Sequence, residues 1–231
     1  MRRAKVCTPV RERGTVAVMV HAFRAKADSD AALHLATCLA EAGIASLRFS
    51  FTDDTDRRGV KDPLQFSDNI EELVFMAEYA RGNLGVPRLL IGHSLDGVAV
   101  LAASQHIPEI VAIATIGVPA DPAGVAHLYD PDSASGNLYM DTVHDTLLSS
   151  QLTHIKKPYL ILHAPEDGLV AIRHGINLFH AAQFPKAFVS LDGCDHSLKE
   201  PRDARYAGRV IARWAERFIF PESLSASEPV T

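Results

Sequence analysis

The sequence predicts an α/β fold in which a mostly parallel sheet of about six strands carries helices on both faces. Two observations lead to this fold class. Apolar segments of strand length alternate with helix-like segments along the whole chain. The strand-like segments are also apolar throughout rather than alternately polar, which is typical of parallel strands that are buried on both faces.

Length and composition predict one globular domain. The chain has 231 residues, of which 47% are hydrophobic and 22% are charged. We expect the domain to cover 1–220, with a disordered tail rich in Ser, Glu and Pro over 221–231. A net charge of −5 and the lack of a basic cluster argue against nucleic acid as a partner. The composition leaves the oligomeric state open.

The location and the cofactors are predicted from what the sequence lacks. No apolar run reaches the roughly 18 residues of a membrane span, and the polar N-terminus is unlike a signal peptide. The three cysteines have no metal-type spacing. We therefore expect a cytoplasmic protein with reduced thiols, no metal and no other cofactor.

The first third of the chain alternates two strands with two helices. The strands are expected at 15–20 and 44–49, and the helices at 29–42 and 67–81. Ser29 or Asp28 suits the N-cap of the first helix, and Gly43 suits its end.

The rest of the chain continues the alternation. Four more strands are expected at 88–92, 110–116, 159–163 and 187–191, with helices at 95–105, 170–182 and 203–218. Residues 118–153 have only weak helical periodicity and are expected to form a short inserted cap.

The segment around Ser94 organises this pattern. An apolar strand leads into Gly92-His93-Ser94-Leu95-Asp96-Gly97, and an alanine-rich helix follows. Such a tight turn exposes a serine hydroxyl at a helix N-terminus, where the next backbone N–H faces the reacting atoms. The usual spelling is G-x-S-x-G, and Asp96 stands where the second glycine is expected. The plain alternative is an ordinary strand-to-helix turn.

Two further residues complete a candidate constellation. Acyl transfer by a serine needs a base and an acid that orients the base. His196 follows the last strand, and Asp167 follows the strand at 159–163. Because parallel strands end at the same edge, their exit loops meet there. Glu166 and Asp121 compete with Asp167 for the role of the acid.

The other candidate residues concern the oxyanion and the substrate. The N–H groups of Leu95 and Phe23 are the candidates for an oxyanion hole, because both follow strands at the expected edge. His93 is expected to pack in the turn rather than act as a base. Residues of the cap could line an acyl pocket: His127, Tyr129, Tyr139 and His144.

These residues resemble the α/β-hydrolase superfamily, and most closely the hydrolase module that precedes an OsmC-like domain in bacterial fusion proteins. The likeness covers most of 15–220, including 47–52, 67–73, 91–95, 114–122, 163–167 and 189–196. It implies a triad of Ser94, Asp167 and His196, in the chain order of that fold, with Phe23 and Leu95 at the oxyanion positions. Because the chain ends at Thr231, no OsmC-like domain is expected. The short N-terminus predicts that the leading strands of the family are missing.

The charge of Asp96 bears on whether the protein is an active hydrolase or a non-catalytic module of the same fold. Two charges roughly 5 Å apart repel by about 3 kcal/mol at an effective dielectric of about 20, so a carboxylate here would oppose the oxyanion. A negative charge in the first turn of a helix is, however, favourable. The sequence therefore predicts a serine hydrolase of small carboxylic esters, with a thioesterase or an amidase as close variants. The alternative is a non-catalytic or attenuated module of the same fold that binds a small molecule or a partner.

Overall fold

The sheet has seven strands, one more than the six counted from the sequence. The structure is a computed structural model, and it describes residues 4–9, 14–20, 29–51, 66–121 and 155–221. The strands are β1 (Lys5–Cys7), β2 (Thr15–Val20), β3 (Ala45–Phe49), β4 (Val86–His93), β5 (Ala112–Ile116), β6 (Tyr159–His163) and β7 (Lys186–Ser190), and they lie in the order β1-β3-β2-β4-β5-β6-β7. All neighbouring pairs are parallel except β1 and β3, which are antiparallel.

The additional strand is β1, at one edge of the sheet. It has three residues, is mostly exposed, and pairs Lys5 with Arg48 and Cys7 with Ser46. A segment this short has no pattern that distinguishes it from a loop. The prediction that the leading strands are missing is therefore wrong for one strand, because β1 precedes β2 and pairs antiparallel to β3.

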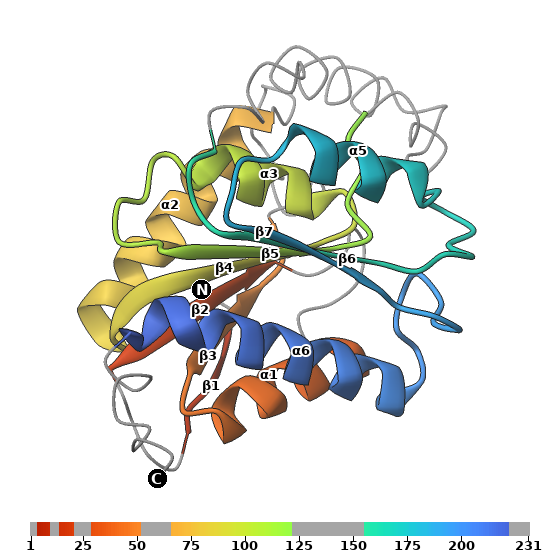
Figure 1. Cartoon of the computed structure of the whole chain (residues 1–231). Helices are drawn as coiled ribbons and strands as arrows, with labels where there is room; N and C mark the ends of the chain where they lie inside the picture. Colours follow the sequence, from red (N-terminus) through yellow and green to blue (C-terminus); the bar gives the residue numbers. More distant parts are fainter. Residues whose placement is uncertain (1–3, 10–13, 21–28, 52–65, 122–154, 222–231) are drawn as a thin grey trace, which may run out of the picture.

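Helices cover both faces of the sheet (Figure 1). One face carries α1 (Asp30–Glu41) and α6 (Pro201–Ile219), and the other carries α2 (Phe66–Asn83), α3 (Asp96–Ala103) and α5 (Arg173–Ala181). The central strands β2, β3, β5 and β6 are buried along their whole length. The sheet is thus the middle of three layers, as the continuous apolar strands predict.

The predicted ends of the first helix are confirmed. Ser29 is the N-cap of α1, and its side chain accepts a hydrogen bond from the Ala32 N–H at 3.3 Å. Gly43 follows the helix with φ of 82°, a left-handed conformation that glycine adopts without strain.

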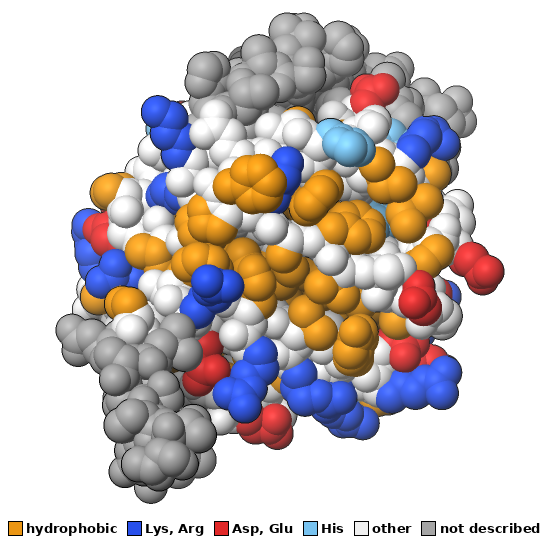
Figure 2. Space-filling view, viewed as in Figure 1, with side chains coloured by type: hydrophobic (Ala, Val, Ile, Leu, Met, Phe, Trp, Pro, Cys, Tyr) orange, Lys and Arg blue, Asp and Glu red, His pale blue; other side chains and the backbone are white. Residues whose placement is uncertain are grey.

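The opposite edge of the sheet is β7, which is only half-buried along its length. Apolar side chains gather on this side of the molecule, between α5 and α6 (Figure 2). Phe184, just before β7, is 82% exposed, and Phe188 in β7 packs against the core. Across the described ranges, no helix combines the length and the apolar character needed to cross a membrane.

Candidate active site

The turn after β4 is the tight strand-to-helix turn that the sequence predicts, but Ser94 is buried, at 3% exposure, and not exposed as expected. β4 ends at His93, α3 begins at Asp96, and Ser94 between them has φ of 57°. This left-handed conformation is costly for a residue with a side chain, so the surrounding structure must hold it. The Ser94 N–H helps to do so by donating to the carbonyl of Ile116 at the end of β5, at 2.9 Å.

Two glycines allow the strand and the helix to approach at this turn. A Cβ on Gly92 would overlap the Cα of Gly97, and a Cβ on Gly97 would overlap the Val118 side chain. The tight contact therefore involves Gly97, three residues after Ser94, and not position 96. Asp96 does not disrupt the turn, because the glycine that the packing requires is still present.

Ser94, His196 and Asp167 lie in one hydrogen-bonded chain. The Nε2 atom of His196 lies 2.8 Å from the Ser94 Oγ, and its Nδ1 atom lies 2.7 Å from the Asp167 Oδ2. The three residues follow β4, β7 and β6, and all are at most 8% exposed. Because the Asp167 carboxylate accepts the Nδ1–H, the neutral imidazole is left with its Nε2 lone pair toward the serine hydroxyl.

The Asp167 carboxylate is held in its ionised form. Burial alone would raise its pKa, but the hydrogen bond from His196 and those from backbone N–H groups outweigh burial and lower the pKa from its usual value. Its Oδ1 accepts the N–H groups of Leu169 at 2.9 Å and Val170 at 2.8 Å. A fixed carboxylate of this kind can stabilise an imidazolium at His196.

Gly117 packs against the hydrogen-bonded pair of His196 and Asp167. No role was assigned to it from the sequence. It follows β5, which lies between β4 and β6, with φ of 56°. A Cβ on Gly117 would lie 3.2 Å from the His196 ring and 3.3 Å from the Asp167 Oδ2. A glycine is thus suited to this position because the hydrogen-bonded pair passes across the end of β5. The only signal in the sequence was a glycine directly after an apolar strand.

Asp96 is buried beside the turn. It is 6% exposed, and burial raises its pKa well above the usual value, with the nearby charge of Glu72 acting in the same direction. A carboxyl group in this position favours its neutral, protonated form. The repulsion expected from a carboxylate next to the oxyanion is correspondingly reduced.

The competing acids lie elsewhere. Glu166 and Asp121 are exposed, whereas Asp167 is buried and bonded to His196. Asp192 accepts a hydrogen bond from Ser190, and Asp195 accepts one from the Lys199 N–H, so both stabilise the turn around His196 rather than orient its ring.

The two proposed oxyanion donors differ in what the structure describes. Leu95 is buried at the N-terminus of α3, and among the described residues no carbonyl oxygen accepts its N–H. Phe23 lies outside the described residues. The same holds for the four cap residues His127, Tyr129, Tyr139 and His144.

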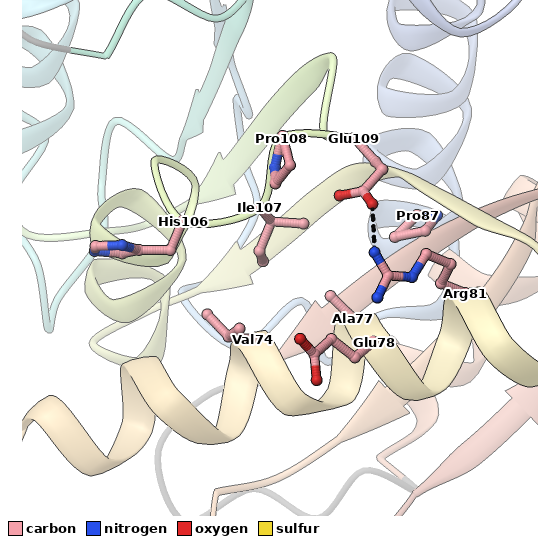
Figure 3. A pocket seen from close by; sticks show the side chains of 9 residues that line it. All are labelled: Val74, Ala77, Glu78, Arg81, Pro87, His106, Ile107, Pro108 and Glu109. Carbon is pink, nitrogen blue, oxygen red and sulfur yellow. Dashed lines mark hydrogen bonds and ion pairs between the residues drawn. The ribbon is translucent and has the colours of Figure 1, made fainter.

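Within the described ranges, no group of three or more His, Cys, Asp or Glu side chains could hold a metal ion. A small hollow is lined by α2 and by the segment between α3 and β5 (Figure 3). Its Arg81 and Glu109 form an ion pair at 2.8 Å. Pro87 in its wall is at the amino end of β4, whereas Ser94 follows the carboxyl end of that strand. The hollow is therefore separate from the site at Ser94.

Known proteins resemble this chain in structure. The esterase domain of a Rhodothermus marinus protein has 33% sequence identity and a TM-score of 0.80, and the match covers 94% of this chain and 92% of that domain. Est1E from Butyrivibrio proteoclasticus has 16% identity and a TM-score of 0.76, with 94% and 93% covered. XC6422 from Xanthomonas campestris, described as an α/β serine hydrolase without a lid, has 18% identity and a TM-score of 0.65, with 91% and 88% covered.

No protein-family model and no curated protein sequence matches the chain. The likeness to the Rhodothermus marinus domain nevertheless extends over nearly the full length of both chains at 33% identity. The strand order, the turn at Ser94 and this likeness agree, and the chain belongs to the α/β-hydrolase superfamily.

Proposed function

We propose that this chain is a serine esterase that cleaves small carboxylic esters through an acyl-enzyme, with Ser94, His196 and Asp167 as its catalytic triad. The observation that carries the proposal is the hydrogen-bonded chain from Ser94 through His196 to Asp167, with distances of 2.8 and 2.7 Å. The strained φ of Ser94 supports it, because such strain is typical of a nucleophile held at a strand-to-helix turn.

In the proposed mechanism the Ser94 Oγ attacks the ester carbonyl carbon while its proton passes to the His196 Nε2. The imidazolium then gives this proton to the leaving alkoxide as the ester C–O bond breaks, which releases an alcohol. A water molecule that His196 deprotonates next attacks the acyl-enzyme. The acid product leaves, and Ser94 regains its proton.

The oxyanion of each tetrahedral intermediate would be stabilised by backbone N–H groups. The Leu95 N–H suits one of the two positions, since it starts α3 and no described carbonyl accepts it. We propose the Phe23 N–H for the second position, because Phe23 comes three residues after the end of β2 along the chain, and β2 runs parallel to β4.

We propose esters with short acyl chains as the substrates. The predicted short cap over 118–153 favours an open pocket, and His127 and Tyr129 are proposed to line it. We expect turnover to be fastest with short acyl chains, and an activity that rises with chains of ten or more carbons would contradict this. Thioesters and amides use the same machinery, so they belong in the same assay series. The resemblance of several segments to hydrolase modules of OsmC-like fusion proteins supports a kinship with that branch.

Covalent labelling tests the proposal. A fluorophosphonate probe is expected to modify Ser94, with turnover of p-nitrophenyl acetate in the same preparation. Ser94→Ala should abolish both labelling and turnover and leave the unfolding temperature nearly unchanged. Ser104→Ala is the matched control, since Ser104 is also buried but donates to the Leu101 carbonyl, and it should retain both. A folded wild-type protein without labelling would favour the non-catalytic binding module.

A further inference from the structure

Two buried histidines outside the proposed triad occupy equivalent places in the fold. His93 is the last residue of β4, directly before Ser94, and His163 is the last residue of β6, shortly before Asp167. They are 1% and 0% exposed. Each strand that leads to the nucleophile or to the acid therefore ends in a fully buried imidazole, which the reaction itself does not use.

Both histidines donate a hydrogen bond to a backbone carbonyl. The His93 Nε2 lies 2.7 Å from the carbonyl oxygen of His196, and the His163 Nε2 lies 2.7 Å from the carbonyl oxygen of Val170. A carbonyl oxygen can only accept, so each ring must carry a proton on Nε2. Neither Nε2 atom is therefore available as a base.

The contact of His163 holds the loop that carries Asp167. The Val170 N–H donates to the Asp167 Oδ1, and the Val170 carbonyl accepts from His163. The backbone of Val170 is thus fixed at its N–H by the Asp167 carboxylate and at its carbonyl by the His163 imidazole. The His163 Nε2 is also 3.8 Å from the Asp167 Oδ2, the oxygen that binds His196. Burial lowers the pKa of His163, which favours its neutral form.

The space around His163 leaves little freedom for the ring. A Cβ on Gly175 in α5 would lie 2.6 Å from the His163 Nδ1, so the ring is packed directly against the glycine. Among the described residues, the Nδ1 atom has no hydrogen-bond partner. The ring is therefore oriented by its hydrogen bond to the Val170 carbonyl and by packing.

The contact of His93 joins the serine turn to the loop of the base. Its acceptor is the backbone of His196 itself, and the two rings lie 5.4 Å apart with an interplanar angle of 36°. A shift of the His196 backbone would change the 2.8 Å distance between its Nε2 and the Ser94 Oγ. The residue before the nucleophile thus fixes the position of the residue that must take its proton.

We propose that His93 and His163 are positioning residues that hold the base and the acid of this hydrolase in register through hydrogen bonds to the carbonyls of His196 and Val170. The inference rests on the proposed function. Its consequence is a lower kcat with little change in KM when either donor is lost, since a misplacement of about 1 Å at a catalytic group can cost about 100-fold in rate.

Paired substitutions test this role. His93→Leu and His163→Leu remove the donor, and each is expected to lower kcat for p-nitrophenyl acetate by about 10- to 100-fold with KM within threefold. His93→Gln and His163→Gln place an N–H near the former Nε2 and should restore most of the loss. His174→Leu is the matched control, because His174 is also buried, at 4% exposure, and neither ring nitrogen has a partner among the described residues. Its kcat should stay within twofold.

Spectroscopy on the unaltered protein makes the test independent of turnover and of variant folding. The ¹⁵N chemical shifts of His93 and His163 should report a proton on Nε2 in both rings, and the proton on the His196 Nδ1 should appear far downfield. In the leucine variants this downfield resonance should shift or broaden, and in the glutamine variants it should return. A wild-type protein without turnover but with these signals would contradict the proposed function alone.

The positioning role itself would be overturned by any of three results. The first is an Nε2 atom without a proton in either histidine of the wild-type protein. The second is a folded leucine variant with unchanged kcat and an unshifted His196 resonance. The third is a His174→Leu variant that loses as much activity as the other two, because the loss would then reflect general repacking of the core.

Discussion

The surroundings of Asp96 in the fold change the charge that we expect on its carboxyl group. From the sequence it is a charge placed next to the nucleophile. In the structure it is 6% exposed, and its burial, followed by the charge of Glu72, raises the pKa of its carboxyl well above the usual value. A carboxyl that favours its neutral form at this place weakens the electrostatic argument for the non-catalytic alternative.

The first prediction concerns this carboxyl. Asp96→Asn keeps its shape and removes the ionisable proton, so kcat at pH 7 should remain within about threefold of the wild-type value. In the wild-type protein, activity should fall at alkaline pH as Asp96, two residues after Ser94, ionises, and the variant should lack this loss. A pH–rate profile of both proteins measures the effect. A loss of more than tenfold at pH 7 in the variant would mean that the carboxyl takes part in the reaction.

The same substitution affects stability with a definite sign. Because the folded state keeps a proton on Asp96 that the unfolded chain releases above about pH 3.9, the wild-type protein loses stability as the pH rises toward the folded pKa. The slope can reach about 1.4 kcal/mol per pH unit for one proton. Urea unfolding should therefore show that the stability of Asp96→Asn gains on that of the wild-type protein as the pH rises from 4 to 8. Glu72→Gln, as a control, should weaken the slope only in part.

The residues of the proposed triad could be found from the sequence because each follows an apolar strand with little intervening chain. The supporting residues could not. Gly117 matters because β5 lies between β4 and β6. His93 matters because of a carbonyl that is distant along the chain, and His163 because of how the loop after β6 folds back onto its ring. These roles depend on strand order and on loop geometry, which local patterns do not contain.

At the level of elements, the apolar pattern located the helices and strands because long buried segments carry a strong signal. The predicted strand at 15–20 has the bounds of β2, and the predicted helix at 203–218 lies within α6. The signal fails for β1, because a strand of three residues has too little periodicity. It also says nothing of contacts that fix one element to the next, such as those of Lys186.

Lys186 in β7 caps the C-terminus of α5. Its ammonium group donates to the carbonyls of Phe179 at 2.7 Å and Ala182 at 2.8 Å, and it lies over the Phe179 and Phe184 rings at 4.7 and 5.0 Å. A cation at this end of a helix also complements the helix dipole. The Lys186 side chain thus links the edge strand β7 to the C-terminus of α5.

The second prediction tests this cap. Lys186→Met keeps the apolar stem and removes the donors, and it should lower the free energy of unfolding by about 1–3 kcal/mol, because hydrogen bonds from a charged group are among the stronger ones. Lys199→Met is the control: the Lys199 side chain is 79% exposed, and its ion pair with Asp195 should contribute less than about 0.5 kcal/mol. Chemical denaturation measures both. Equal effects at the two positions would argue against the cap.

On the scale of the whole molecule, the layered fold assembles the site from distant segments. Four neighbouring strands, β4 to β7, end at one edge and supply in turn Ser94, Gly117, Asp167 and His196. The sequence predicts that these ends share an edge, because parallel strands run in the same direction. It does not predict their order, which is fixed by how the helices of both faces pack.

This assembly places neutral histidines in the core, and they should make the fold sensitive to acid. Burial lowers the pKa of His163 and of His174, and for His174 the neighbouring charge of Arg173 adds to the effect. The unfolded chain binds protons on these rings below about pH 6.5, and the folded protein does so only at a lower pH. Stability should therefore decrease as the pH falls below about 6.5, and this loss ends where the folded rings titrate.

The third prediction isolates one of these rings. His174→Leu removes a buried imidazole without a hydrogen-bond partner among the described residues, so at pH 7 the variant should be as stable as the wild-type protein or more stable. Between pH 6.5 and 5 its free energy of unfolding, measured in urea, should fall less steeply, by up to about 1.4 kcal/mol per pH unit for the one proton removed. Asp96 gives a slope of the opposite sign in acid, but it is common to both proteins and cancels in the comparison. Parallel curves for the two proteins would mean that His174 binds its proton equally well in the folded and unfolded states, and the acid sensitivity would then have to come from His163 and the loop that it holds.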